Sequence, residues 1–268
     1  MTLKQKFYDS YHKKNSNFYA IIKKNNFTYF ELLRFFYDKV TPQLPANYSK
    51  IKVLDVGCGV GTMAFYFASL GMSVRGIDVS KRAIDICTQA KKQLKSKNSS
   101  FEKKLLDVGS NQFDMVLTSE VIEHIEDEEK FLKRISSHLK KDGVLFLTTP
   151  LKENVLYKLG FYKKFDAEVG HLRRYTVSSI THLLQANGFT VLDYSVVEGP
   201  LRNILFTTKL GFLIKFIKGP LIPVFHFLDW ISIQFFGASD ILVLAEKSAH
   251  TIAKKSAYKI ANKEPKHR

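Results

Sequence analysis

The chain has 268 residues, 45% of them hydrophobic, which suits one large globular domain or one domain with additions. Its two cysteines, Cys58 and Cys87, exclude a disulfide framework and favour a reducing, cytoplasmic setting. The first residues lack an apolar core of signal-peptide length, so we do not expect secretion. The net charge of +16 predicts attraction to an anionic partner, unless it only serves solubility. The basic residues are mostly scattered lysines rather than an arginine-rich segment with interleaved aromatics, which argues against an RNA partner.

The first 40 residues carry aromatic side chains throughout and are predicted to be helical. The Thr41-Pro42 pair and Pro45 should end this region. From Thr28 onward the segment is apolar on nearly all sides, so we expect it to pack on the domain that follows. We therefore place a helical cap at 1–45.

A short apolar run over 51–56 is followed by three glycines at alternate positions and then by a helical pattern over 61–71. This order predicts a buried strand, a glycine turn and a helix start. Gly57, Gly59 and Gly61 permit positive φ and a close approach of a ligand to the backbone. Asp55, just before the first glycine, suits a ligand with a positive group rather than a pyrophosphate. The G-x-G-x-G spacing also differs from the G-x-G-x-x-G of dinucleotide folds.

The stretch V-L-D-V-G-C-G-V-G-T resembles the first motif of class I S-adenosylmethionine-dependent methyltransferases. The resemblance implies an α/β fold, a Rossmann-like seven-stranded sheet of order 3-2-1-4-5-7-6 with helices on both faces. It also implies that Asp55 and the glycine turn, including Cys58, bind the methionine part of the cofactor. In this family N-terminal helices often cover the site, which makes Tyr11 a candidate substrate contact, although ordinary packing is the alternative.

Acidic residues follow the next two expected strands, 73–77 and 101–106. Ligands bind at the carboxyl ends of strands in an open parallel sheet. Asp78, with Val79 beside it, resembles the ribose-binding acid of the family; its alternative role is to cap the helix 81–94, for which Ser80 is better placed. Asp107 and Val108 match the positions that contact adenine, although they could equally form a simple turn.

The expected fourth strand, 113–118, leads into Ser119-Glu120-Val121-Ile122-Glu123-His124-Ile125. This phrase resembles ubiquinone-biosynthesis O-methyltransferases, a group acting on small molecules and lipids, and Ser119 is assigned to the cofactor by that resemblance. Glu120 and His124 would share a face on a helical turn, whereas Glu123 and His124 would diverge unless the segment is irregular. The cluster could hold Mg²⁺, although a histidine is an awkward Mg²⁺ ligand; it could supply a general base, or it could stabilise the helix expected over 125–139.

After the fifth expected strand, 144–149, a long loop over 151–175 ends in Gly170-His171-Leu172-Arg173-Arg174-Tyr175-Thr176. This phrase resembles bacterial relatives in the same group. In an extended loop His171 and Arg173 point the same way and could hold a substrate oxygen, with Tyr175 nearby. Anchoring of the loop to acidic residues is the alternative. Thr176 and Gly188 should cap and end the helix 177–187.

The last two expected strands, 189–197 and 241–246, are separated by an insertion, 199–239, that is far longer than a hairpin loop. Its 201–237 part is strongly apolar but broken by lysines and by Gly219-Pro220, and no run is long enough to span a membrane. Two short helices at an anionic membrane surface are expected; a pocket cover or a dimer surface is the alternative. The methyltransferase domain is thus assigned to 46–247, followed by a basic tail, 248–268.

Together these features predict an S-adenosylmethionine-dependent enzyme that methylates a hydroxyl of a lipid-like or membrane-proximal small molecule. It is expected in the cytoplasm at the inner face of a membrane, with Mg²⁺ as an optional cofactor. His124, Glu120 and His171 are the candidate catalytic residues. The alternatives are a glycan or glycolipid methyltransferase and a cofactor-binding peripheral membrane protein without catalysis. Nucleic acid is not an expected acceptor, because base-methylation motifs such as N-P-P-Y are absent after the fourth strand.

Overall fold

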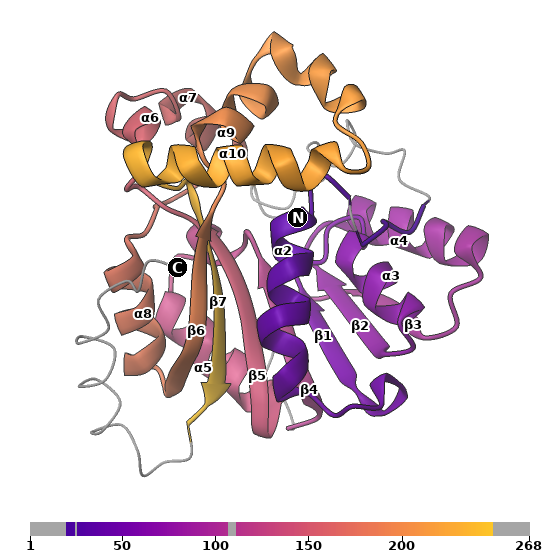
Figure 1. Cartoon of the computed structure of the whole chain (residues 1–268). Coiled ribbons are helices and arrows are strands. Elements are labelled where there is room, and N and C mark those ends of the chain that lie inside the picture. The colour runs from indigo at the N-terminus through magenta and orange to yellow at the C-terminus, as the bar shows by residue number, and fades with distance from the viewer. Residues whose placement is uncertain (1–19, 25, 107–110, 249–268) are drawn as a thin grey trace.

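The computed structural model describes residues 20–24, 26–106 and 111–248 and shows a seven-stranded sheet (Figure 1). The strand order is β3-β2-β1-β4-β5-β7-β6, and only β7 runs antiparallel to its neighbours. The predicted Rossmann-like methyltransferase sheet is therefore confirmed. The strands are β1 Lys52–Val56, β2 Ser73–Asp78, β3 Ser99–Lys103, β4 Phe113–Ser119, β5 Leu139–Pro150, β6 Phe189–Val197 and β7 Asp240–Lys247.

Two apolar clusters, one for each face of the sheet, hold the helices in place. One joins α5 and α8 to the strands, and the other joins α2, a following π turn and α3. The fully buried Phe36, Phe67 and Phe146 lie in the second cluster, which explains why the apolar segment after Thr28 packs as predicted. These helices are α2 Phe30–Phe35, η1 Phe36–Val40, α3 Thr62–Ser69, α5 Glu128–His138 and α8 Val177–Ala186. The helix α4 (Lys81–Leu94) packs on β2 and β3.

Several element boundaries differ from the sequence expectations for local reasons. The third strand begins at Ser99 rather than Phe101, because its register with β2 pairs Val74 with Ser99. The helix α5 begins at Glu128 rather than Ile125, since the Asp127 side chain accepts a hydrogen bond from Lys130 N and caps it there. The expected Asp142-Gly143 turn is an irregularity inside β5, with Asp142 at φ 65°.

Other local expectations are confirmed. Ser80 caps α4 by accepting a hydrogen bond from Ala83 N at 3.1 Å. Thr176 caps α8 in a reciprocal arrangement with Ser179, and Gly188 follows it at φ 82°. The turns outside the main helices are η2 Thr41–Gln43, η3 Tyr48–Lys50 and η4 Ile122–His124.

A layer of helices lies across the carboxyl ends of the parallel strands (Figure 1). The expected loop over 151–175 contributes two of them, and the apolar insertion contributes three, interrupted at Gly219-Pro220 as predicted. None of the described helices combines the length and the apolar character that a membrane span requires. These elements are α6 Val155–Lys158, α7 Lys163–Val169, α9 Pro200–Thr207, η5 Lys209–Phe216 and α10 Leu221–Phe236.

Candidate active site

A cavity of about 1820 Å³ lies between the sheet edge and this helical layer. Typical ligand pockets have volumes of roughly 300–1,000 Å³, so this cavity has room for two ligands side by side. One end is lined by the glycine turn after β1 and by the end of β2. The other end is lined by the ends of β4 to β7 and by the loop before α8.

The glycine turn is fixed by backbone hydrogen bonds and by crowding. Gly57, Gly59 and Gly61 have φ of 73°, 51° and 80°, a backbone conformation that residues other than glycine rarely adopt. Gly57 N and Cys58 N both donate to Ile77 O. A Cβ at Gly57 would lie 2.4 Å from Val121 Cγ2, so the turn has no space for a side chain there.

Asp78 connects this turn to the second strand. Its Oδ2 accepts a hydrogen bond from Gly59 N at 2.9 Å, and its Oδ1 accepts one from Ser80 N at 2.8 Å. Each carboxylate oxygen has a second lone pair, so Asp78 can still accept hydrogen bonds from a pair of hydroxyls. Asp78 also lines the cavity.

Asp55 is the buried acid behind the turn. Burial, and next the charge of Asp78, raise the pKa of its carboxyl to about 7. An ammonium group beside Asp55 would stabilise the ionised form and return this pKa towards its usual range. The end of the cavity near β1 therefore suits a ligand with both a cationic group and a vicinal diol, which fits S-adenosylmethionine.

The residues assigned to the cofactor from sequence are mostly brought together here. Gly61 is instead the N-cap of α3 and does not line the cavity, and Asp107 and Val108 lie outside the described residues. Tyr11 also lies outside the described residues. Those that line the cavity are Asp55, Gly57, Cys58, Gly59, Asp78, Val79 and Ser119.

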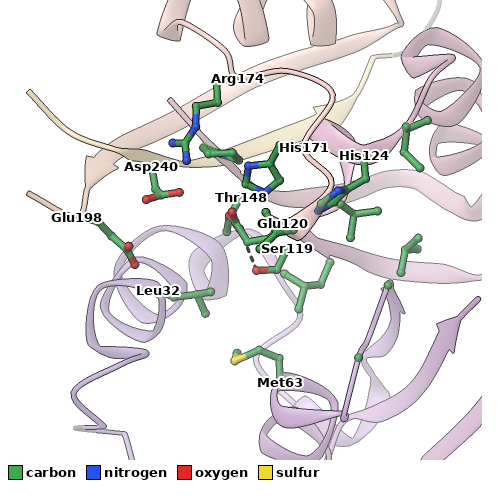
Figure 2. Close-up of a pocket in the computed structure, with 18 of the residues that line it drawn as sticks. Leu32, Met63, Ser119, Glu120, His124, Thr148, His171, Arg174, Glu198 and Asp240 are labelled. Atoms are coloured by element: carbon green, nitrogen blue, oxygen red, sulfur yellow. Dashed lines mark hydrogen bonds between the residues drawn. The ribbon is translucent and has the colours of Figure 1, made fainter. Parts of the chain in front are cut away.

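The chain after β4 is irregular, and this irregular backbone sets the positions of the Glu120, Glu123 and His124 side chains. Glu120 has φ of 56°, and Ile122–His124 is a single 3-10 turn. Glu120 Oε1 accepts a hydrogen bond from Thr148 Oγ1 at 2.7 Å, and Thr148 is also bonded to Ser119 Oγ (Figure 2). Burial raises the pKa of the Glu120 carboxyl, and the neighbouring Glu123 raises it further.

Glu123 lies close to two histidines, His124 and His171, which are 47 positions apart in the sequence. Its Oε1 lies 3.6 Å from His124 Nε2 and 3.9 Å from His171 Nε2, and the two rings are 4.9 Å apart. Glu123 is fully buried, and this oxygen has no hydrogen-bond partner within the described residues, while Oε2 accepts one from Thr149. Burial raises the pKa of the Glu123 carboxyl.

The opposite nitrogens of both rings are held by acceptors. His124 Nδ1 donates to Gly170 O at 2.9 Å, and His171 Nδ1 lies 2.8 Å from Asp166 Oδ1. In its neutral form, each ring therefore carries its lone pair on Nε2, the nitrogen nearest Glu123 Oε1. Burial lowers the pKa of His171 to about 4, so this ring is neutral near pH 7.

These three side chains can accept a proton or hold a metal ion. Their ligand atoms all lie within 4.8 Å of one another. Metal-binding histidines usually donate their second N–H to a carboxylate or carbonyl, as both rings do here. Two nitrogens and one carboxylate suit a transition metal better than Mg²⁺, which prefers oxygen. The structure thus places His171, rather than Glu120, with Glu123 and His124.

The predicted pairing of His171 with Arg173 is wrong. Residues 171–174 are irregular, so the two-residue period of a strand does not apply to them. Arg173 pairs with Glu128 and donates to Ile125 O, and the Tyr175 hydroxyl also bonds Glu128. Neither side chain lines the cavity, and both anchor the loop to the start of α5.

Sequence reasoning missed a polar group at the other end of the cavity. Arg174 lines it, held by Asp166, and its guanidinium lies 4.8 Å from the ring centre of Tyr162. Glu198 and Asp240 face the same space (Figure 2). Because β7 is antiparallel, its first residue, Asp240, lies at the edge where the other strands end. Sequence reasoning considered only the residues that follow each strand, and so it did not find Asp240.

Comparison with known proteins agrees with this geometry. The sequence model of a methyltransferase domain family matches residues 28–194. A ubiquinone biosynthesis O-methyltransferase of Pelagibacter ubique is 40% identical over 101 residues, covering 37% of this chain and 42% of that protein. The mitochondrial protein of that name from Bos taurus is 38% identical over 171 residues, covering 58% of this chain and 45% of the relative. The chain spans about half the length of the curated relatives it matches.

Two solved structures share the fold at low identity. The magnesium protoporphyrin IX methyltransferase of Synechocystis aligns with a TM-score of 0.62 at 17% identity, covering 92% of this chain and 99% of that one. The phosphoethanolamine N-methyltransferase 2 of Haemonchus contortus aligns with a TM-score of 0.59 at 20% identity, covering 78% and 51%. With the family match over more than half of its residues, the chain belongs to the methyltransferase domain family.

Proposed function

We propose that the protein is an S-adenosylmethionine-dependent O-methyltransferase that acts on an amphiphilic small molecule in a cytoplasmic setting. The observation that carries the proposal is that His124 and His171 line the same cavity as the glycine turn, with the carboxylate of the buried Glu123 close to both rings. Curated relatives that the chain matches are named ubiquinone biosynthesis O-methyltransferases, which supports a hydroxyl acceptor.

The cofactor supplies a methyl group on a sulfonium centre, whose thioether leaving group needs no protonation. Asp55 would hold the cofactor's ammonium group, and Asp78 would accept hydrogen bonds from its ribose hydroxyls. These contacts fix the position of the methyl group relative to the acceptor, which lowers the entropic part of the barrier.

The acceptor hydroxyl must lose its proton as the new bond forms. His124 Nε2 takes this proton, and Glu123 Oε1, 3.6 Å away, stabilises the resulting imidazolium. His171 stays neutral and packs beside the His124 ring, with 4.9 Å between the ring centres. Glu120, bonded to Thr148, supports the turn that presents His124.

The remaining walls of the cavity suit an amphiphilic acceptor. Phe161, Phe165 and Phe206 line its apolar part. Its polar part contains Asp240 and Tyr162, whose buried hydroxyl has no hydrogen-bond partner within the described residues. A second hydroxyl on the acceptor could form a hydrogen bond there. For that reason a glycolipid sugar, which carries several hydroxyls, is the alternative acceptor.

The direct test is methyl transfer from radiolabelled cofactor to a total lipid extract, followed by mass identification of the product. We expect a product that gains one methyl ether. Tight cofactor binding without transfer to any fraction would instead support the non-catalytic alternative.

The raised pKa of Asp55 predicts a pH-dependent affinity for the cofactor. The carboxyl must be ionised to pair with an ammonium group, and its pKa without ligand is about 7. Affinity for S-adenosylhomocysteine should therefore rise by roughly 15-fold between pH 5.5 and 7, because the ionised fraction of the carboxyl rises by about that factor. Calorimetric titration across this range measures it. Asp55→Asn should bind more weakly with a flat profile, and a wild-type profile that is equally flat would contradict the assignment.

The cluster of Glu123, His124 and His171 predicts that divalent ions change the melting temperature. If it holds a divalent ion, Mn²⁺ or Zn²⁺ should raise the melting temperature more than Mg²⁺, and Glu123→Gln should abolish the shift. The carboxyl has a raised pKa and must be ionised to bind, so the shift should grow from pH 6 to pH 8. Thermal melts with each chloride salt test this. If no ion changes the melting temperature, the cluster does not bind a divalent ion. His124 would then act as the base without a metal.

A further inference from the structure

The helix α10 buries its polar side chains and exposes its apolar side chains, the reverse of a helix whose outer face contacts water. His226, Asp229 and Ser232 are buried, while the outward positions hold large apolar side chains. Phe235 is 75% exposed, and Trp230 is 46% exposed. A surface helix of a globular protein normally shows the opposite pattern.

The buried polar residues fix α10 in this orientation. Asp229 accepts hydrogen bonds from Gly199 N at 2.7 Å and Arg202 N at 2.9 Å, and so holds the first turn of α9. His226 lies between Glu31 at 3.3 Å and Phe27 O at 3.2 Å. The reversal is therefore built into the tertiary structure.

Neighbouring elements extend the apolar surface. We call the exposed apolar side chains of α10, α9, η5 and the α6–α7 segment the apolar cap face. These elements form one layer at the end of the sheet (Figure 1). Most of the large apolar side chains that are exposed in the described residues belong to it, and its most exposed members include Leu159, Phe161, Phe212, Phe216 and Phe235.

The charges on the insertion indicate what covers this face. Among residues 201–237 the charged side chains are Arg202, Asp229 and three lysines. Arg202 and Asp229 are buried, whereas Lys209, Lys215 and Lys218 are exposed. Apolar side chains interspersed only with exposed lysines match an anionic lipid interface, where aromatic side chains insert and lysines reach the headgroups.

The cavity opens within the same face. Phe161, Phe165, Ile204 and Phe206 are exposed and also line the cavity. A molecule with an apolar tail could therefore pass from a lipid layer to the histidine cluster without crossing water.

We propose that the apolar cap face docks on an anionic phospholipid bilayer and admits the methyl acceptor directly from it. The entry step rests on the proposed function, whereas the docking step does not. The insertion would lie in the interface, because its helices are too short to span the bilayer.

Trp230 is the only tryptophan of the chain and lies on this face, so its fluorescence reports docking directly. The full-length protein is mixed with phosphatidylcholine vesicles, with or without phosphatidylglycerol. We expect a blue shift and quenching by brominated acyl chains with the anionic vesicles. Both signals should weaken in high salt and in Lys215→Gln/Lys218→Gln.

The matched variants are Leu228→Ser/Phe235→Ser on α10 and Leu192→Ser/Tyr194→Ser on β6, all exposed positions. The first pair should lower vesicle partitioning by roughly tenfold or more, because each of its two substitutions removes apolar side-chain area that would insert into the bilayer. The second pair should leave partitioning unchanged. Affinity for S-adenosylhomocysteine is measured in each variant to confirm folding.

Absence of any change in Trp230 fluorescence with anionic vesicles would overturn the proposal. So would a stable dimer in sedimentation whose Trp230 is already buried and which Leu228→Ser/Phe235→Ser converts to monomer. Vesicle binding without methyl transfer would leave docking intact and contradict the proposed function instead.

Discussion

Replacing His124 by alanine should lower kcat for methyl transfer by about 10²- to 10⁴-fold, the usual contribution of a positioned general base. His124 lines the cavity, and its Nε2 lies 3.6 Å from Glu123 Oε1. Affinity for S-adenosylhomocysteine should stay unchanged, because the cofactor contacts lie at Asp55 and Asp78. Single-turnover transfer of a labelled methyl group to the identified acceptor measures the loss.

His182→Ala is the matched control, because His182 is exposed on α8 and does not line the cavity. It should retain wild-type turnover. A His124→Ala enzyme that turns over at the wild-type rate would exclude this residue as the base. A loss of cofactor affinity in the same variant would show that His124 acts by supporting the cofactor end of the cavity instead.

Replacing Gly57 by alanine should have the second large effect, on stability and on cofactor binding together. The new Cβ would lie 2.4 Å from Val121 Cγ2 at a φ of 73°. Left-handed backbone at a non-glycine residue costs about 1–2 kcal/mol, and overpacking adds typically about 1–3 kcal/mol. Urea unfolding should therefore show a lower midpoint, and calorimetry should show weaker binding of S-adenosylhomocysteine.

Two further variants distinguish the cost of the left-handed backbone at Gly57 from the cost of the steric clash with Val121. Gly71 has φ of 99° with no atom within 4 Å of an added Cβ, so Gly71→Ala should lose only the conformational part of the stability. Val121→Ala removes the clashing methyl group, and the Gly57→Ala/Val121→Ala double variant should recover the crowding part. If Gly57→Ala and Gly71→Ala destabilise equally, the contact with Val121 is not a constraint on the turn.

The sheet and its cofactor end were predictable because their signals are local in the sequence. Alternating and continuous apolar runs determine the strands, and glycines before a helix determine the turn. Asp55 and Asp78 follow directly from strand ends, since every parallel strand delivers its last residue to one edge. The strand order came from the family resemblance rather than from these local signals, and the structure confirms it.

The acceptor end was predicted only in part, because its geometry depends on contacts between distant segments. Spacing alone placed Glu120 with His124 and His171 with Arg173. The left-handed backbone at Glu120 and the irregular loop at 171–174 changed both pairings. His171 reached Glu123 only because the loop before α8 folds back, with Leu172 N bonded to Glu123 O.

The sequence by itself therefore determined the fold class, the glycine turn and the apolar character of the insertion. Each depends on the pattern of neighbouring residues. Only the tertiary structure decided that Glu123, His124 and His171 share one site, and that Asp229 and His226 turn the apolar side of α10 outward. The physical reason is that a buried polar group takes whichever partner the fold brings near it, and that partner is not encoded in its neighbours along the chain.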